Sequence, residues 1–182
     1  MAEKRLRNFE TAGEFFRMFG GVFRTMSGMR RIPKNERIAA EFSERIMLAV
    51  TAVNQCAYCS FLHTQTALEK GVQLDQIHQI LEGEIGSFSD EEIPAVLYGQ
   101  HYAETKGNVS AAAREKFISA YGASRAGHIE GYIMSVCFGN LCSNTVYTRE
   151  NNLLTPEQKR RGLLLYLLCK PIAAGIRRSG KR

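Results

Sequence analysis

The chain has 182 residues, of which 45% are hydrophobic and 23% charged, so it fits one globular domain over residues 1–182 and no second catalytic module is expected. Its 24 basic and 18 acidic residues give a net charge of +6, but four of the positive charges lie in a basic tail at 176–182 (Arg177, Arg178, Lys181 and Arg182), so the rest of the chain is nearly neutral. Because the chain lacks a basic stripe interleaved with aromatic residues, we do not expect it to bind nucleic acid.

The N-terminal part of the chain predicts a helix and no targeting segment. No basic patch followed by a long apolar block is present, and Glu3, Glu10 and Glu14 are untypical of a transit peptide. The apolar periodicity indicates a first helix over about 9–26, and Pro33 breaks the helix that precedes it. The apolar side chains of this helix cover too wide an arc for packing on one surface, so we expect it to contact two surfaces, the second of which could belong to another subunit. These side chains are Phe9, Phe15, Phe16, Phe19, Phe23 and Met26.

Helical periodicity continues through the rest of the chain. A second helix is expected over about 35–53, and it is apolar nearly all round from Ile46 onward, which indicates a buried half. Asn54 is expected to cap the third helix, Ser89 begins a capping box, and the last helix begins with Thr155-Pro156-Glu157-Gln158. The other expected helices are 55–70, 74–81, 89–105, 110–121 and 124–147. Since strand alternation is almost absent, these segments predict an all-α bundle of seven or eight helices, with its core at about 35–170.

Composition also indicates the compartment. The most apolar run, 162–169, is followed by Lys170 and Pro171 and is too short to span a membrane. The five cysteines are an odd number, which favours free thiols in a reducing compartment over a framework of disulfides. We therefore expect a cytoplasmic protein without a membrane span.

One segment places three reactive side chains on the same face of a helix. It reads Cys56-Ala57-Tyr58-Cys59-Ser60-Phe61-Leu62-His63, and at about 100° per residue positions 56, 59 and 63 fall within about 60° of each other. An imidazole one turn from a thiol can take its proton or stabilise the thiolate, which is the nucleophilic form. The two thiols are close enough to form a disulfide, so the segment predicts a dithiol that can cycle. The helix dipole favours Cys56 as the attacking thiol and the neighbouring histidine favours Cys59, so the residues alone leave this choice open.

A carboxylate of the preceding helix is expected to join this group. Glu44 lies about 180° from the main apolar stripe of the helix, and its own side carries further apolar residues, so we expect it to be partly buried. Burial raises the pKa of a carboxyl group and suits it to proton transfer.

The spacing Glu44-x11-Cys56-x-x-Cys59-x-x-x-His63 resembles the signature of AhpD-like alkylhydroperoxidases, which belong to the carboxymuconolactone decarboxylase superfamily. The helical pattern from about 35 to 105 fits the core of that family, and Asn140 resembles an asparagine that often lies on a later helix. Four fixed residues at fixed spacings are a far more specific signal than a lone Cys-x-x-Cys pair. The chain departs from the pattern at Tyr58, where the peroxidase prototype of the family has a second histidine and the wider superfamily frequently has tyrosine.

The resemblance implies a thiol-dependent hydroperoxide reductase with an antioxidant role, in a homo-oligomer that is commonly a trimer or a hexamer. By the family pattern, Cys59 attacks the peroxide and becomes a sulfenic acid, and Cys56 resolves it to a disulfide. His63 and Glu44 relay protons through a water. An external thiol donor, dihydrolipoyl or thioredoxin-like in the family, restores the dithiol, and no tightly bound cofactor or metal is expected.

Other interpretations stay open at this point. The two cysteines and His63 could be a buried core cluster, or they could hold zinc with Glu44 as the fourth ligand, although zinc-binding Cys-x-x-Cys pairs usually lie on a turn. The superfamily also contains lactone decarboxylases, which use no cysteine pair, and a non-enzymatic redox-sensing oligomer could use the same disulfide to alter partner binding. The remaining cysteines and histidines are expected to have no catalytic role: Cys137, Cys142, Cys169, His78, His101 and His128.

Overall fold

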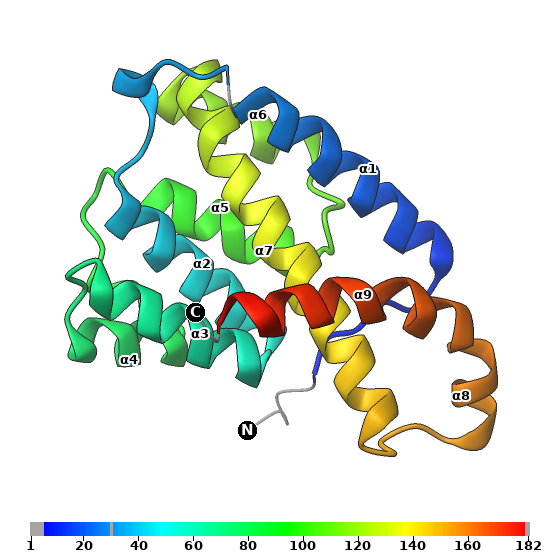
Figure 1. Cartoon of the computed structure of the whole chain (residues 1–182). Helices are drawn as coiled ribbons and strands as arrows, with labels where there is room; N and C mark the ends of the chain where they lie inside the picture. Colours follow the sequence, from blue (N-terminus) through cyan, green and yellow to red (C-terminus); the bar gives the residue numbers. More distant parts are fainter. Residues whose placement is uncertain (1–5, 30, 181–182) are drawn as a thin grey trace.

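The computed structural model describes residues 6–29 and 31–180, and every regular element in this part of the chain is helical, which confirms the expected all-α fold. Nine α-helices and one short 3₁₀ helix, η1, follow one another in the described residues (Figure 1). They are α1 (Ala12–Met29), η1 (Lys34–Glu36), α2 (Ala40–Asn54), α3 (Ala57–Glu69), α4 (Leu74–Glu82), α5 (Ile93–Glu104), α6 (Ala111–Tyr121), α7 (Ala123–Glu150), α8 (Pro156–Arg161) and α9 (Leu163–Ser179).

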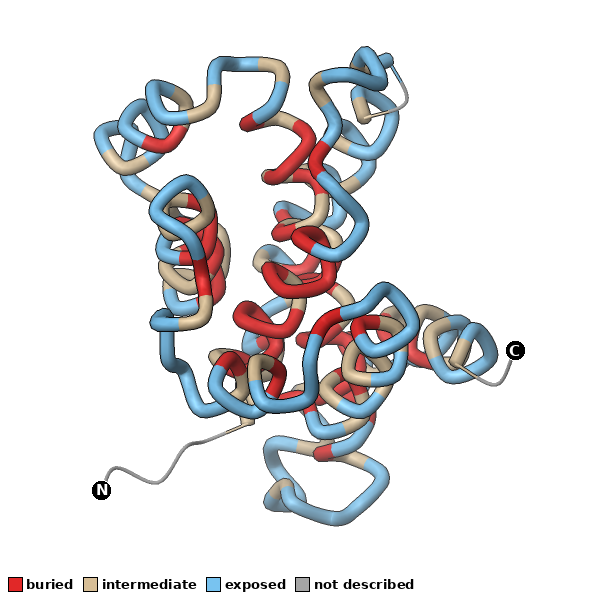
Figure 2. The backbone as a smooth tube through the Cα atoms, turned by 90° about the vertical axis from the view of Figure 1, so that its left-hand side faces the viewer, coloured by how far each residue is buried: buried red, intermediate tan, exposed pale blue. Residues whose placement is uncertain are grey.

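The longest helix, α7, runs through the middle of the molecule (Figure 1). Helices α1, α2, α5, α6 and α9 all pack against it. Its inward side chains, among them Ile129, Ile133 and Leu141, are completely buried and belong to the main hydrophobic core. Figure 2 shows the buried residues gathered on the inner sides of the helices, with exposed residues on the outer sides. Burial on one face of each surrounding helix is what holds helices of moderate intrinsic stability in place.

Helix α2 is enclosed on several sides. It packs against α3, α4, α5 and α7, and the expectation of a buried second half is confirmed, because Ile46, Leu48 and Thr51 have no exposed surface. Leu48 belongs to a second, smaller core cluster that includes Ala67 of α3 and Ile77 of α4. The side chains that α2 directs at α3 are therefore fixed by the packing of the whole helix.

The last expected helix proves to be two. Thr155 and Gln158 form the expected capping box, in which the Gln158 amide donates to Thr155 Oγ1 (3.3 Å) and the Thr155 amide donates to Gln158 Oε1 (2.9 Å). Helix α8 then ends at Arg161, and α9 begins after Gly162, a residue of low helix propensity. This division accounts for nine helices where seven or eight were expected.

Helix α9 continues through Pro171 to Ser179, so Arg177 and Arg178 lie in its last turn, where cations favourably face the helix dipole. The expected basic tail at 176–182 is thus largely helical. Lys181 and Arg182 of that tail, and Glu3 near the other end, lie outside the described residues. Within the described residues, no helix is long and apolar enough to cross a membrane.

Helix α5 begins later than its capping box predicts. The Ser89 amide does donate to Glu92 Oε2 (3.0 Å), but the helix begins only at Ile93, with Pro94 in its first turn. The Glu92 carboxylate also accepts two hydrogen bonds from Arg45 of α2 (2.9 and 3.0 Å), so it serves a tertiary ion pair as well as the local turn. The contact between Glu92 and Arg45 could not be predicted from the capping-box sequence, because Arg45 lies on another helix.

Candidate functional site

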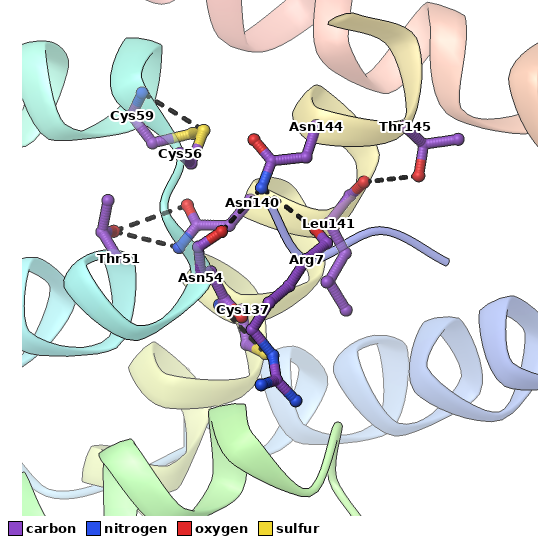
Figure 3. The surroundings of a disulfide bond; sticks show 10 residues. All are labelled: Arg7, Thr51, Asn54, Cys56, Cys59, Cys137, Asn140, Leu141, Asn144 and Thr145. Carbon is purple, nitrogen blue, oxygen red and sulfur yellow. Dashed lines mark hydrogen bonds between the residues drawn. A yellow bond between two sulfur atoms is a disulfide. The ribbon is translucent and has the colours of Figure 1, made fainter. Parts of the chain in front are cut away.

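Cys56 and Cys59 form a disulfide at the N-terminus of α3, with their Cα atoms 5.3 Å apart (Figure 3). Helix α2 ends at Asn54, and Gln55 takes a left-handed backbone conformation with a φ of 55°, which turns the chain sharply into α3. Cys56 is the N-cap of α3, and its sulfur accepts a hydrogen bond from the Cys59 amide (3.4 Å). The two sulfurs are therefore as close as expected, although Cys56 precedes the first turn of the helix.

The expected N-cap at Asn54 is wrong. Asn54 is the last residue of α2 and is completely buried, with its Nδ2 3.5 Å from the sulfur of Cys137 on α7. Asparagine is a favourable N-cap in general, but here its side chain contacts another helix and cannot reach back to the amides of α3. A cysteine sulfur, a weaker acceptor, takes the capping position instead.

The predicted carboxylate and imidazole are in direct contact. Glu44 of α2 places Oε2 2.9 Å from Nδ1 of His63, which lies one turn after Cys59 on α3. The proton relay between His63 and Glu44 was expected to run through a water, but the two side chains are in direct contact. The other oxygen, Oε1, accepts a hydrogen bond from the ammonium group of Lys70 at 2.5 Å. Both oxygens of one carboxylate are bound by side chains that come from the α3 segment.

The ionisation of Glu44 differs from the expectation. Burial raises the pKa of this carboxyl group, since only 5% of its side chain is exposed, but the hydrogen bonds and charges of His63 and Lys70 outweigh burial and lower the pKa below its ordinary value. Glu44 is therefore ionised at neutral pH. In the neutral tautomer in which Nδ1 of His63 donates to this carboxylate, Nε2 is the ring nitrogen that can accept a proton.

Lys70 is the residue that sequence analysis missed. It follows His63 by seven positions, close to two helical turns, so it lies on the same side of α3 as the motif. That spacing was a usable signal, because a lysine two turns from the histidine reaches the same neighbouring helix. The Glu44 carboxylate, which His63 and Lys70 both bind, therefore joins α2 to the α3 segment.

A buried polar network from α7 lies beside the disulfide (Figure 3). Asn140, which the family resemblance singled out, donates from Nδ2 to Thr51 Oγ1 of α2 at 3.0 Å. Asn144 donates from Nδ2 to the carbonyl of Asn54 at 2.8 Å and to the carbonyl of Arg7 at 3.0 Å. The bond to Asn54 satisfies a carbonyl group at the end of α2, and the network links this end, next to the turn that precedes Cys56, to α7 and to the N-terminal segment.

The disulfide itself is buried, since Cys56 is 1% and Cys59 3% exposed. A small recess of about 180 Å³ lies at the same junction of α2 and α3. It is lined by Thr51, Ala52, Gln55, Ala57, Ser60 and Leu81. His63 keeps 18% of its side chain exposed, so the site is close to solvent without being open to it.

Tyr58 does not join the contact between Glu44 and His63. Its hydroxyl donates to the carbonyl of Arg177 in the last turn of α9 at 3.3 Å. Tyr58 therefore links α3 to the C-terminal helix, and it takes a structural contact at the position where the family's peroxidase prototype has a histidine.

The other cysteines and histidines stand apart from this site. Cys137, Cys142 and Cys169 are free and buried, and burial raises the pKa of the Cys137 thiol to about 11, so it stays protonated at neutral pH. His128 is buried and accepts the Ile38 amide on Nδ1 (3.1 Å), which is a structural role. His78 is exposed and His101 half-buried, neither near the motif in sequence.

The donor groups of the site do not fit the zinc alternative. In the part of the chain that the structure describes, no three histidine, cysteine, aspartate or glutamate side chains are placed to hold a metal ion. The two sulfurs are joined to each other, and both Glu44 oxygens are bound by His63 and Lys70. A passive core cluster would also require a polar partner for His63, and Glu44 supplies one.

Comparison with known proteins agrees with the motif. Residues 21–85 match the model of the carboxymuconolactone decarboxylase family, and this segment contains Glu44, Cys56, Cys59, His63 and Lys70. The match confirms the resemblance to the superfamily of the AhpD-like proteins. Neither the curated proteins nor the solved structures compared with the chain gave a match.

Proposed function

We propose that this chain, which carries a carboxymuconolactone decarboxylase family segment, is a thiol-dependent hydroperoxide reductase of the AhpD-like type. The observation that supports the proposal is the Cys56–Cys59 disulfide one turn before a histidine whose other side is bound by an ionised carboxylate. A thiol pair, a base and a group that orients the base are the parts that nucleophilic thiol chemistry needs.

The proposed reaction has three steps. In the reduced protein, Cys59 gives its proton to His63 Nε2, and the thiolate attacks the outer oxygen of the hydroperoxide ROOH. The O–O bond breaks, the alkoxide takes the proton from His63 and leaves as ROH, and Cys59 becomes a sulfenic acid. The Cys56 thiol then displaces the hydroxyl group as water and forms the disulfide. An external dithiol reduces this disulfide by exchange and is itself oxidised.

Each remaining part of the site has a role in this scheme. Glu44 stays ionised, holds the Nδ1–H of His63 and stabilises the imidazolium that forms when Nε2 is protonated. Asn140 and Asn144 hold the end of α2, so that Cys56 stays within reach of Cys59. No bound cofactor takes part, and the electrons come from a dihydrolipoyl or thioredoxin-like donor protein. We place this antioxidant role in the cytoplasm, where the free thiols of Cys137, Cys142 and Cys169 stay reduced.

The test combines turnover with mass mapping of the thiols. The reduced protein should consume an organic hydroperoxide with a dithiol donor, and one equivalent of peroxide should convert Cys56 and Cys59 to the disulfide. Cys56→Ser should stop at a sulfenic acid on Cys59 that dimedone traps, whereas Cys59→Ser should lose turnover. Trapping at Cys56 in Cys59→Ser would reverse the order of attack, which the capping hydrogen bond to the Cys56 sulfur makes a real alternative. Wild-type turnover in both variants would refute the proposal.

A second candidate is a lactone decarboxylase, which the name of the matching family favours. That reaction needs no cysteine pair, so alkylation of both thiols distinguishes the two. Decarboxylation that survives complete alkylation, with no peroxide turnover before it, would favour this candidate.

A third candidate is a non-enzymatic redox sensor, favoured by the broad exposed apolar face of α1. The reduced and oxidised forms of the protein would then differ in how they bind a partner. Equal binding by both forms would refute the redox-sensor candidate.

A further inference from the structure

The buried carboxylate of Glu44 carries a full negative charge that the redox motif alone balances only when the imidazole of His63 is protonated. Glu44 is 4% exposed, and Nδ1 of His63 contacts its Oε2, so a neutral imidazole brings only a hydrogen bond whereas a protonated imidazole brings a positive charge as well. Burying an unpaired carboxylate is costly, so without a cation the pair would lower its energy by binding an additional proton. A second positive charge beside Glu44 would keep the carboxylate ionised while the imidazole is neutral.

Lys70 is that charge. It is the C-cap residue of α3, its Nζ lies 2.5 Å from Glu44 Oε1, and a third of its side chain is exposed, so the ammonium group keeps contact with solvent. The lysine approaches Oε1 while His63 approaches Oε2, so the two do not compete for one oxygen. Two turns of one helix thus fix both ends of the carboxylate.

We propose that Lys70 is a positioning residue of the redox site, whose ammonium group keeps the Glu44 carboxylate ionised and so holds His63 in the tautomer that can take a proton from a cysteine thiol. The inference rests on the proposed function only for the identity of the reaction. The arrangement of charge is a property of the folded protein and can be measured without turnover.

The surroundings of Glu44 support this assignment. Among the described residues, His63 and Lys70 are the groups whose hydrogen bonds and charges lower the pKa of Glu44 against the effect of burial. Helices α4, α5 and α7 also pack against α2, but no charged side chain of theirs contributes to that shift. Removing Lys70 therefore leaves burial opposed by His63 alone.

The experiment measures the ionisation of Glu44 directly. Carbon-13 NMR follows the glutamate carboxyl signals of the reduced protein across pH, and Glu44→Gln assigns the signal. Lys70→Met should move the Glu44 titration midpoint upward by roughly one pH unit or more, because an adjacent opposite charge is lost. Lys70→Gln, which keeps a hydrogen-bond donor without the charge, should do the same, and it serves if Lys70→Met does not fold. Lys70→Arg should restore the wild-type midpoint.

A second readout connects the charge to the thiols. Mass spectrometry measures the rate of iodoacetamide alkylation at Cys56 and at Cys59 across pH. As the pH is lowered, this rate should begin to drop at a higher pH in Lys70→Met than in the wild type, whereas the two proteins should react at equal rates in alkaline solution. Lys116→Met, which removes an exposed lysine of α6, should leave the midpoint and the alkylation profile unchanged.

The outcomes separate the two proposals. An unmoved or lowered Glu44 midpoint in Lys70→Met, or an Arg variant that shifts as far as the Met variant, would overturn the role of Lys70 even if peroxide turnover is strong. A raised midpoint in a protein with no peroxide turnover would uphold the role of Lys70 while the proposed function fails.

Discussion

At the scale of single residues, Glu44 shows how two opposing effects decide an ionisation state. Burial favours the neutral acid, and that effect alone is what the apolar pattern of α2 predicts. Two donors from α3 favour the anion, and together they prevail. The burial of Glu44 could be predicted from its position on the helix, but the direction of its pKa shift could not, because Lys70 lies outside the motif that drew attention to the site.

The lowered pKa of Glu44 predicts how stability depends on pH. A carboxyl group with a depressed folded pKa stabilises the fold fully above the ordinary carboxyl pKa, and that contribution is lost as the pH falls through the lowered value. Glu44→Gln should therefore reduce the free energy of unfolding at neutral pH by roughly 1–3 kcal/mol, with the difference shrinking in acid. Urea denaturation of the reduced protein at several pH values measures both effects.

Glu69→Gln is the matched control for this substitution, because Glu69 is an exposed glutamate of the neighbouring helix, α3. It should change stability by less than about 0.5 kcal/mol at every pH. A Glu44→Gln penalty that stays constant from neutral pH into acid would show that the side chain contributes packing and hydrogen bonds rather than charge. Peroxide turnover in Glu44→Gln should fall roughly a hundredfold, since His63 loses its anionic partner.

At the scale of helices, the junction of α2 and α3 is the element on which the site depends. Asn144 of α7 donates both hydrogens of its amide group to main-chain carbonyls, one of them that of Asn54 at the end of α2. Asn144→Ala should remove the side-chain donor from the Arg7 carbonyl and one of the two donors to the Asn54 carbonyl, and so reduce the free energy of unfolding by roughly 1–3 kcal/mol. Denaturant unfolding measures the loss, and the rate of Cys56–Cys59 disulfide formation reports on the junction.

Asn151→Ala provides the comparison, since the exposed Asn151 donates only to the Tyr147 carbonyl of its own helix end. The free energy of unfolding of Asn151→Ala should lie within about 0.5 kcal/mol of the wild-type value. If both variants lose equal stability and form the disulfide at the wild-type rate, the network of α7 does not hold the junction.

This junction also marks the limit of prediction from sequence. Helical periodicity located most helices to within a few residues, and the Cys-x-x-Cys spacing correctly placed Cys56 and Cys59 close enough to form a disulfide, because local spacing determines both. The cap at Asn54 could not be predicted, since it depends on contacts with α7 more than 80 positions away. The ion pair between Arg45 of α2 and Glu92, the glutamate of the capping box before α5, likewise depends on a contact between distant segments.

At the scale of the whole molecule, α1 keeps an apolar face that residues 6–29 and 31–180 leave exposed. At about 100° per residue, the four exposed apolar side chains lie within about 80° of one another on the helix. They are Phe16, Phe19, Phe23 and Met26, with Phe23 72% exposed. Phe15 and Met18 lie on the adjacent arc and are buried in the main core with α7. The sequence predicted two contact surfaces for this helix, and one of them is present within the chain.

We expect a second copy of the chain to cover the other surface, because a contiguous exposed apolar face on a helix is typical of an interface and the proposed function implies a homo-oligomer. Light scattering after size exclusion should give a trimer or a hexamer for the wild type. Phe23→Glu should weaken each contact by roughly 2 kcal/mol or more, about thirtyfold in Kd, since it removes a ring that the interface buries and introduces a charge.

Phe61→Glu makes the same change at an exposed phenylalanine of α3 and should leave the assembly intact. A monomeric wild type, or assembly that Phe23→Glu does not disturb, would contradict this interface. Dissociation caused only by Phe61→Glu would move it to the face of α3 beside the disulfide.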